Sequence, residues 1–167
     1  MNFAIACLAA SLAWSVPVPL GNLKRLFSDL HRANELEMQL GRLAARRGAS
    51  ASVRRYGDRL ERDHRLADGR LLKLARRHRV LIEELAPEPD QELDIQRLRA
   101  LNGPDFDRLF AQTMEREHRR QNERLSAAVA LTGGDVRRLL SEFGPVQREH
   151  ETLAKYLEGR ERGAHAL

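Results

Sequence analysis

Residues 51–78 read ASVRRYGDRLERDHRLADGRLLKLARRH, and their periodicity is the strongest indication of the fold. Small or apolar residues recur at alternating steps of four and three, at Val53, Gly57, Leu60, Ala67, Leu71 and Leu74, and His64 fills the remaining position of the series. This spacing places one continuous stripe along a helix and is typical of a helix packed in a bundle. Ser50 or Ser52 supplies an N-cap, and we expect the helix to end near His78.

Three further segments carry apolar stripes with steps of three and four residues. The first, Leu23 to Arg47, stops before a glycine, which is a common residue just beyond a helix C-terminus. The second opens at Asn102-Gly103-Pro104 and ends at Thr132-Gly133-Gly134. The third begins with Asp135 as its N-cap, and Pro145 within it predicts a kink.

The links between these four helices differ in length, and the difference predicts the topology. Short links make the first and second helices one antiparallel hairpin and the third and fourth helices another. The long link between the hairpins contains Pro87-Glu88-Pro89 and a piece of one or two helical turns from Leu93 to Leu101. The sequence therefore predicts an all-α, ferritin-like four-helix bundle, in which a long crossover with a short extra helix joins the hairpins. A simple up-down-up-down bundle is the alternative.

Length and composition favour one domain and exclude several classes of protein. The chain has 167 residues, of which 42% are hydrophobic and 32% charged. Cys7 is the only cysteine, so neither an intrachain disulfide nor a thiolate metal cluster can form. No Gly-rich phosphate loop, Ser/His/Asp arrangement or zincin helix occurs, so dehydrogenase, kinase and hydrolase activities have no residues to carry them. We do not favour an enzyme.

The net charge of +5 raises the question of nucleic-acid binding. Arginines alternate with acidic residues three or four positions away along residues 54–65 and 115–124, which is typical of a solvated, ion-paired helix face. No exposed aromatic residues are expected beside them to stack on bases. Nucleic acid is therefore a disfavoured partner. The basic residues from Arg76 through Arg79 could attract the protein to an anionic membrane surface, and this alternative stays open. A homo-oligomer also stays open.

The ends of the chain are expected to lie outside the bundle, which we place at residues 22–158. Residues 3–12, FAIACLAASL, form an apolar run of the length found in signal peptides, and Ala13-Trp14-Ser15 fits a cleavage site. We interpret residues 1–21 as a signal peptide, although Met1-Asn2 lacks a basic residue; a buried or frayed N-terminal helix is the alternative. Export implies a periplasmic or envelope location. Residues 159–167 are predicted to be a flexible tail.

One polar residue interrupts the apolar stripe of each helix: Glu37, His64, His118 and His150. Measured from the turn of each hairpin, the two members of a pair lie about 3 Å and about 1.5 Å apart along the helix axis. If the hairpins pack face to face, three imidazoles and a carboxylate converge in one layer. Such a set suits a divalent ion such as Zn²⁺, Fe²⁺ or Mn²⁺. A metal-free polar network, or a register that leaves these groups at the rim, stays open.

Other polar residues near this layer receive secondary roles. Glu61 and Glu115 each stand three positions before a histidine, a spacing that directs both side chains toward one site, so we count them as secondary metal candidates. The acids directly beside the histidines point about 100° away and are expected to pair with arginines: Asp63, Glu117 and Glu149. The other histidines are interpreted as structural or exposed: His31, His78 and His165.

An ordered set of residues carries a family resemblance. It consists of Asn34-x-x-Glu37-x-x-x-Gly41-x-Leu43-Ala44, Asp63-His64, Asn102-Gly103-x-x-Phe106-Asp107, His118, and Pro145 with His150. Over about residues 22–158 the chain resembles the bacterial domain-of-unknown-function family 4142, a ferritin-like group whose members are often exported. The resemblance implies a ferritin-like bundle and supports export, and it supplies no reaction.

A di-iron centre is disfavoured, because such a centre needs a lone Glu on two helices and Glu-x-x-His on the other two. Here the Glu-x-x-His pairs fall on successive helices, and the fourth helix offers Gln147.

Three classes of function stay open. They are an exported bundle that binds a metal ion for stress protection or metal handling, a metal-free envelope-associated or interaction protein, and a basic nucleic-acid-binding bundle.

Overall fold

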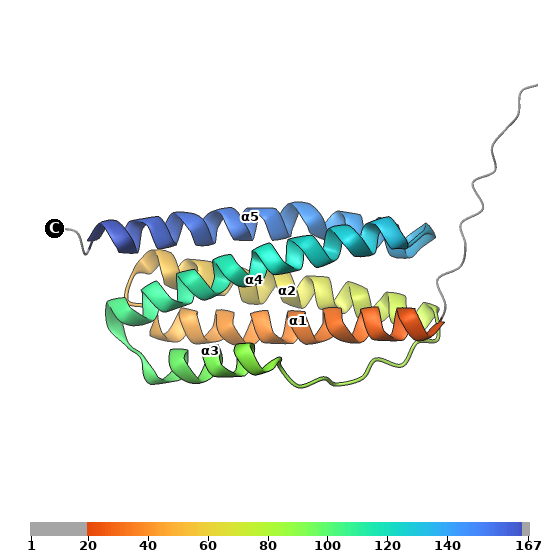
Figure 1. Ribbon diagram of the computed structural model, residues 1–167, viewed down its shortest axis with the longest axis horizontal. Coiled ribbons are helices and arrows are strands. Elements are labelled where there is room, and N and C mark those ends of the chain that lie inside the picture. The colour runs from red at the N-terminus through yellow and green to blue at the C-terminus, as the bar shows by residue number, and fades with distance from the viewer. Residues whose placement is uncertain (1–19, 165–167) are drawn as a thin grey trace, which may run out of the picture.

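The computed structural model describes residues 20–164, which form five helices (Figure 1). Their bounds are α1 Leu20–Arg47, α2 Ala51–Arg77, α3 Pro89–Ala100, α4 Gly103–Leu131 and α5 Gly134–Ala164. The predicted ends of α2 are confirmed: the Ser50 side chain accepts a hydrogen bond from the Val53 amide, and His78 is the C-cap residue. The all-α class is likewise confirmed.

The helices pair as two hairpins, α1 with α2 and α4 with α5, which contact each other through α2·α5 and α1·α4. The chain leaves α2 at one end of the bundle and returns along its length to α3, close to the start of α4 (Figure 1). Helices α2 and α4 therefore run in the same direction. This confirms the predicted crossover topology and excludes the up-down-up-down alternative.

Two separate hydrophobic clusters form the core, one toward each end of the bundle. One cluster packs around Leu60, Phe110 and Ala154, and the other around Leu71, Leu125 and Leu140. On α2, α4 and α5 the predicted polar residue falls between the residues that belong to the two clusters. The histidines of these helices therefore form a polar layer that divides the apolar core.

Glycine contacts bring α1 and α2 close together at the end of the bundle where they are joined. A Cβ added at Gly57 would lie 2.6 Å from the Gly41 carbonyl oxygen, and one added at Gly41 would lie 2.7 Å from the Gly57 carbonyl oxygen. The turn beyond this contact is held by the Asp107 carboxylate of α4, which accepts hydrogen bonds from the amides of Ala49 at 2.8 Å and Ser50 at 2.7 Å. These contacts tie the second hairpin to the first.

One predicted boundary is wrong. Helix α3 begins at Pro89 rather than near Leu93, because Glu88 and Gln91 form a capping box and a proline at the first position suits a helix start. Helix α5 includes Pro145 and continues to Ala164, and the flexible tail at residues 159–167 stays a prediction.

The predicted signal peptide, apart from its last two residues, lies outside the described residues. Within the described residues, none of the helices combines the length and the apolar character that crossing a membrane requires.

Candidate metal centre

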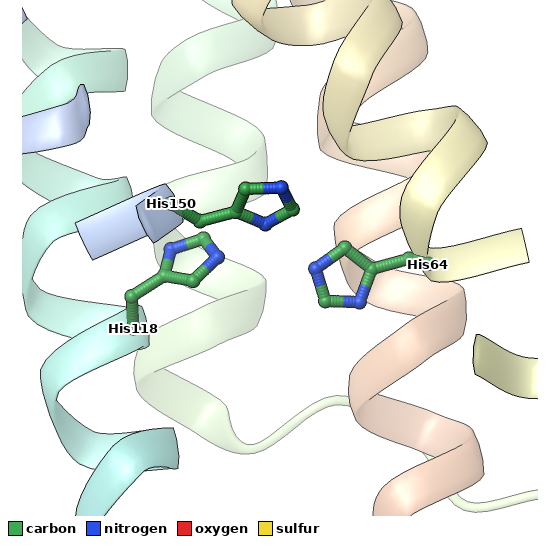
Figure 2. A group of neighbouring side chains, drawn as sticks. All are labelled: His64, His118 and His150. Carbon is green, nitrogen blue, oxygen red and sulfur yellow. The ribbon is translucent and has the colours of Figure 1, made fainter. Parts of the chain in front are cut away.

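Three of the four predicted polar residues meet in the middle of the bundle. The rings of His64 from α2, His118 from α4 and His150 from α5 point toward one another (Figure 2). Their centroids lie 6.0 Å, 5.4 Å and 5.3 Å apart, and one nitrogen of each ring lies within 4.8 Å of the others. All three side chains are buried. We refer to them as the histidine cluster.

Each ring of the cluster is anchored through its other nitrogen. The His118 Nδ1 donates to the Met114 carbonyl oxygen at 2.8 Å, and the His150 Nε2 donates to the Asp63 carboxylate at 3.0 Å. A carbonyl oxygen and a carboxylate can only accept, so the anchored nitrogen of each ring carries the proton.

The same reasoning applies to His64, through one further residue. The Asn34 amide nitrogen donates to Asp68 at 3.3 Å, which turns the Asn34 amide oxygen toward His64. That oxygen accepts a hydrogen bond from the His64 Nδ1 at 3.0 Å. The anchored nitrogen of His64 therefore also carries the proton of the neutral ring.

Three lone pairs consequently face one another in the core. They belong to His64 Nε2, His118 Nε2 and His150 Nδ1, which are buried and have no hydrogen-bond partner among the described residues. Three acceptors cannot satisfy one another, and leaving them without a partner costs free energy. An electrophile placed between them would satisfy all three at once.

The environment keeps these rings neutral. Burial lowers the pKa of His64 well below its usual value, and the neighbouring His118 and His150 lower it further. Burial lowers the pKa of His118 to about 3. Burial also lowers the pKa of His150, although the hydrogen bond to Asp63 opposes the shift. Neutral imidazole is the form that binds metal ions.

Glu37, the fourth predicted residue, is fully buried on α1 but does not belong to the group of atoms that lie within 4.8 Å. Its Oε1 accepts a hydrogen bond from the Gln121 side chain at 3.1 Å, and its Oε2 has no partner among the described residues. Burial and the nearby charge of Glu117 raise the pKa of Glu37 to about 8. A cation close by would favour the charged form of this carboxylate.

The secondary candidates bind arginines instead of facing the cluster. Glu61 contacts Arg65 and lies 3.5 Å from Arg42, while Glu115 lies 2.9 Å from Arg119. Neither carboxylate belongs to the group of ligand atoms around the cluster.

The three acidic residues adjacent to the histidines in sequence have different partners. Glu149 pairs with Arg59 of α2 at 2.7 Å, as expected. Asp63 also contacts Arg59, but the prediction missed its hydrogen bond to His150. Glu117 is buried rather than on the surface, and it accepts hydrogen bonds from Gln91 of α3 and from Arg120.

A second group of ligand types was not predicted. His31, Glu35 and Asp68 offer atoms within 4.8 Å of one another, and the His31 Nδ1 lies 2.7 Å from Asp68. Asp68 also binds Asn34, so this group is linked to the histidine cluster through hydrogen bonds. The sequence signal was the spacing of His31 and Glu35, which puts both on one helix face.

His78 lies 2.9 Å from Asp135, as expected of a structural residue, and His165 lies outside the described residues.

The fold and the site together define an all-α bundle of two hairpins with a buried cluster of three neutral histidines. Among known families, the chain belongs to the one described as a domain of unknown function, DUF4142, which matches residues 19–157. This confirms the family resemblance. Neither a curated protein nor a solved structure matches the chain.

Proposed function

We propose that this DUF4142 bundle binds one divalent transition-metal ion between His64, His118 and His150. The observation that carries the proposal is the convergence of three buried lone pairs, each on a ring whose other nitrogen is anchored. Zn²⁺, Fe²⁺ and Mn²⁺ all accept imidazole nitrogen, and sites with three protein ligands keep a position for a further ligand.

The surroundings of the cluster support the same proposal. Ligating histidines generally donate their second N–H to a carboxylate, a backbone carbonyl or another acceptor, which fixes the tautomer and the ring orientation. Asp63, the Met114 carbonyl oxygen and Asn34 supply one such acceptor each. Glu37 is a further buried carboxyl group in the core, and its Oε2 has no partner among the described residues.

We further propose that the protein acts outside the cytoplasm, in metal handling or protection against stress. The apolar run and cleavage pattern of residues 3–15 support export. The lack of any sequence signature of a hydrolase, kinase or dehydrogenase supports a binding role over catalysis.

The test is the metal content of protein purified without a histidine tag and offered Zn²⁺, Mn²⁺ and, without oxygen, Fe²⁺. We expect one ion per chain, lost in the His118→Ala and His150→Ala variants. His78→Ala is the matched control, because His78 is a half-exposed histidine that pairs with Asp135 at the end of α2. Absence of stoichiometric metal in the folded wild-type protein would contradict the proposal and favour a metal-free polar layer.

The second group requires its own control. The His31→Ala variant removes a ligand from the group of His31, Glu35 and Asp68 while leaving the three rings of the cluster in place. We expect this variant to keep its metal. Loss of metal in His31→Ala with retention in His118→Ala would move the site to the second group.

A further inference from the structure

A cleft of about 580 Å³ lies between the two hairpins, next to the histidine cluster. Its volume lies in the range of small-molecule sites, roughly 300–1,000 Å³. Apolar side chains of all four long helices line its walls, among them Leu26 and Leu30 of α1, Ala67 of α2, Leu125 and Ala128 of α4 and Phe143 of α5. Leu66 of α2 lines it too and is 65% exposed, so one side of the cleft is open to solvent.

The floor of the cleft is polar and includes one ring of the cluster. His64 itself lines the cleft, together with Gln121 and Gln147. Gln121 stands three residues after His118 on α4, and Gln147 stands three residues before His150 on α5, so each amide lies about one helical turn from a ring of the cluster. The Gln147 amide donates to Gln121 at 3.3 Å, which spans the two helices at this level.

Two residues of this floor each carry a buried polar atom without a partner. The Oε1 of Gln147 is buried and has no hydrogen-bond partner among the described residues, and the same holds for the His64 Nε2. His64 is only 2% exposed. A cleft whose walls are apolar and whose inner end holds unsatisfied polar atoms is the usual form of a ligand site.

The charged residues at the mouth are engaged with each other. Arg32 and Arg124 both bind Glu88, at 2.9 Å and 3.1 Å, and Arg70 binds Glu142. The mouth therefore offers paired charges, whereas the interior offers apolar surface and one polar end. A ligand that matches this pattern has a hydrocarbon body and a single polar head.

We propose that the cleft binds a small monocarboxylate with a hydrocarbon chain, whose carboxylate reaches the metal position at the histidine cluster while its chain lies along the leucine-lined walls. This inference rests on the proposed metal site. An ion held by three neutral imidazoles keeps its positive charge and accepts a carboxylate oxygen as a further ligand. Each glutamine amide at the floor has a second N–H that can donate to the same carboxylate.

The test uses the Co²⁺-loaded full chain, because the visible absorption of Co²⁺ reports both the presence of the ion and a change of its ligands. Octanoate is the probe, and acetate is the comparison with the same head and almost no chain. We expect octanoate to shift the Co²⁺ bands saturably, at concentrations at least tenfold lower than acetate. Burial of two methylene groups already gives about a tenfold gain in affinity.

Two filled-cleft variants separate chain binding from carboxylate binding. Ala128→Phe and Ala67→Phe place a ring in the cleft, and each should weaken octanoate at least tenfold with little effect on acetate. The matched control is Ala127→Phe, an exposed position on the same helix that does not line the cleft. Retained Co²⁺ bands show that a variant is folded. If the Ala128→Phe variant does not fold, the Ala67→Phe variant is measured in its place.

The outcomes distinguish the two proposals. Normal Co²⁺ bands that octanoate leaves unchanged, or that octanoate and acetate shift equally well, would overturn the cleft proposal and leave the metal site intact. Equal octanoate affinity in wild-type protein and in folded filled-cleft variants would overturn it as well. Absence of Co²⁺ bands in folded wild-type protein would contradict both proposals.

Discussion

Replacing Asp63 by Asn tests whether the hydrogen bonds around the histidine cluster prepare it for a metal ion. Asp63 accepts the N–H of His150 at 3.0 Å, and in doing so directs the His150 Nδ1 lone pair toward the other two rings. Asparagine has nearly the same shape but carries no charge, and it can present an NH₂ group instead of an oxygen. The variant therefore weakens the anchor of one ring and leaves all three rings in the chain.

The expected loss follows from the contact. A hydrogen bond to a charged group contributes about 1.5–3 kcal/mol, and the lower half of that range applies because Asp63 is 22% exposed and also contacts Arg59. About 1.5–2 kcal/mol corresponds to a decrease in metal affinity of roughly 10- to 30-fold. This lies within the roughly 10- to 100-fold loss that is typical when a residue that orients a metal-binding histidine is replaced.

The assay is a Zn²⁺ titration against a competing chelator, with wild-type protein, Asp63→Asn and the matched control Asp58→Asn. Asp58 is an exposed carboxylate on the same helix, so its loss changes the net charge equally without touching a histidine. We expect the control to bind like wild type. Equal affinities for wild type and a folded Asp63→Asn variant, or an equal loss in the control, would show that the Asp63 hydrogen bond does not prepare the cluster for a metal ion.

Three further predictions concern pH and the contact between α1 and α2. Burial lowers the pKa of the cluster histidines, so the metal-free protein is most stable above about pH 6.5 and loses up to about 1.4 kcal/mol per histidine for each pH unit below it; equal free energies of unfolding of the Glu37→Gln variant in urea at pH 7 and pH 5, where Glu37 no longer titrates, would contradict this. The pKa of Glu37 is raised to about 8, so its effect on stability runs in the opposite direction, and the free energy of unfolding falls as the pH rises from about 4.5 toward 8. The Glu37→Gln variant should therefore gain stability relative to wild type between pH 5 and pH 8 in the same assay, and a constant difference would count against it. Gly57→Ala should destabilise by about 1–3 kcal/mol because its Cβ meets the Gly41 backbone, whereas Gly69→Ala on the same helix meets nothing within 4 Å and should stabilise by about 0.5–1 kcal/mol; thermal unfolding of both variants checks the order.

The arrangement of the long helices and their buried polar residues could be predicted because both depend on local sequence. Helical periodicity alone places His64, His118 and His150 in the apolar stripes, and chain distance from the turns places them at one level. The crossover followed from the contrast between short and long links. The start of α3 was missed, since it depends on capping by Glu88 and Gln91 rather than on apolar spacing.

The partners of the cluster could not be predicted, because they depend on how neighbouring helices sit against each other. Asp63 points away from His64 on its own helix, yet α5 packs on that side and brings His150 to it. Asn34 was noted only as part of the family pattern, and its role appears once the α1–α2 contact turns it toward His64. The cleft likewise depends on the separation of the two hairpins, which no local pattern records.

The most direct test of metal binding by the histidine cluster is anomalous diffraction from crystals of the untagged protein grown with Zn²⁺, measured on both sides of the zinc absorption edge. We expect one strong peak bonded by His64 Nε2, His118 Nε2 and His150 Nδ1, at about 2.0–2.1 Å from each nitrogen. A cluster without a peak, or a single peak at His31, Glu35 and Asp68, would contradict it.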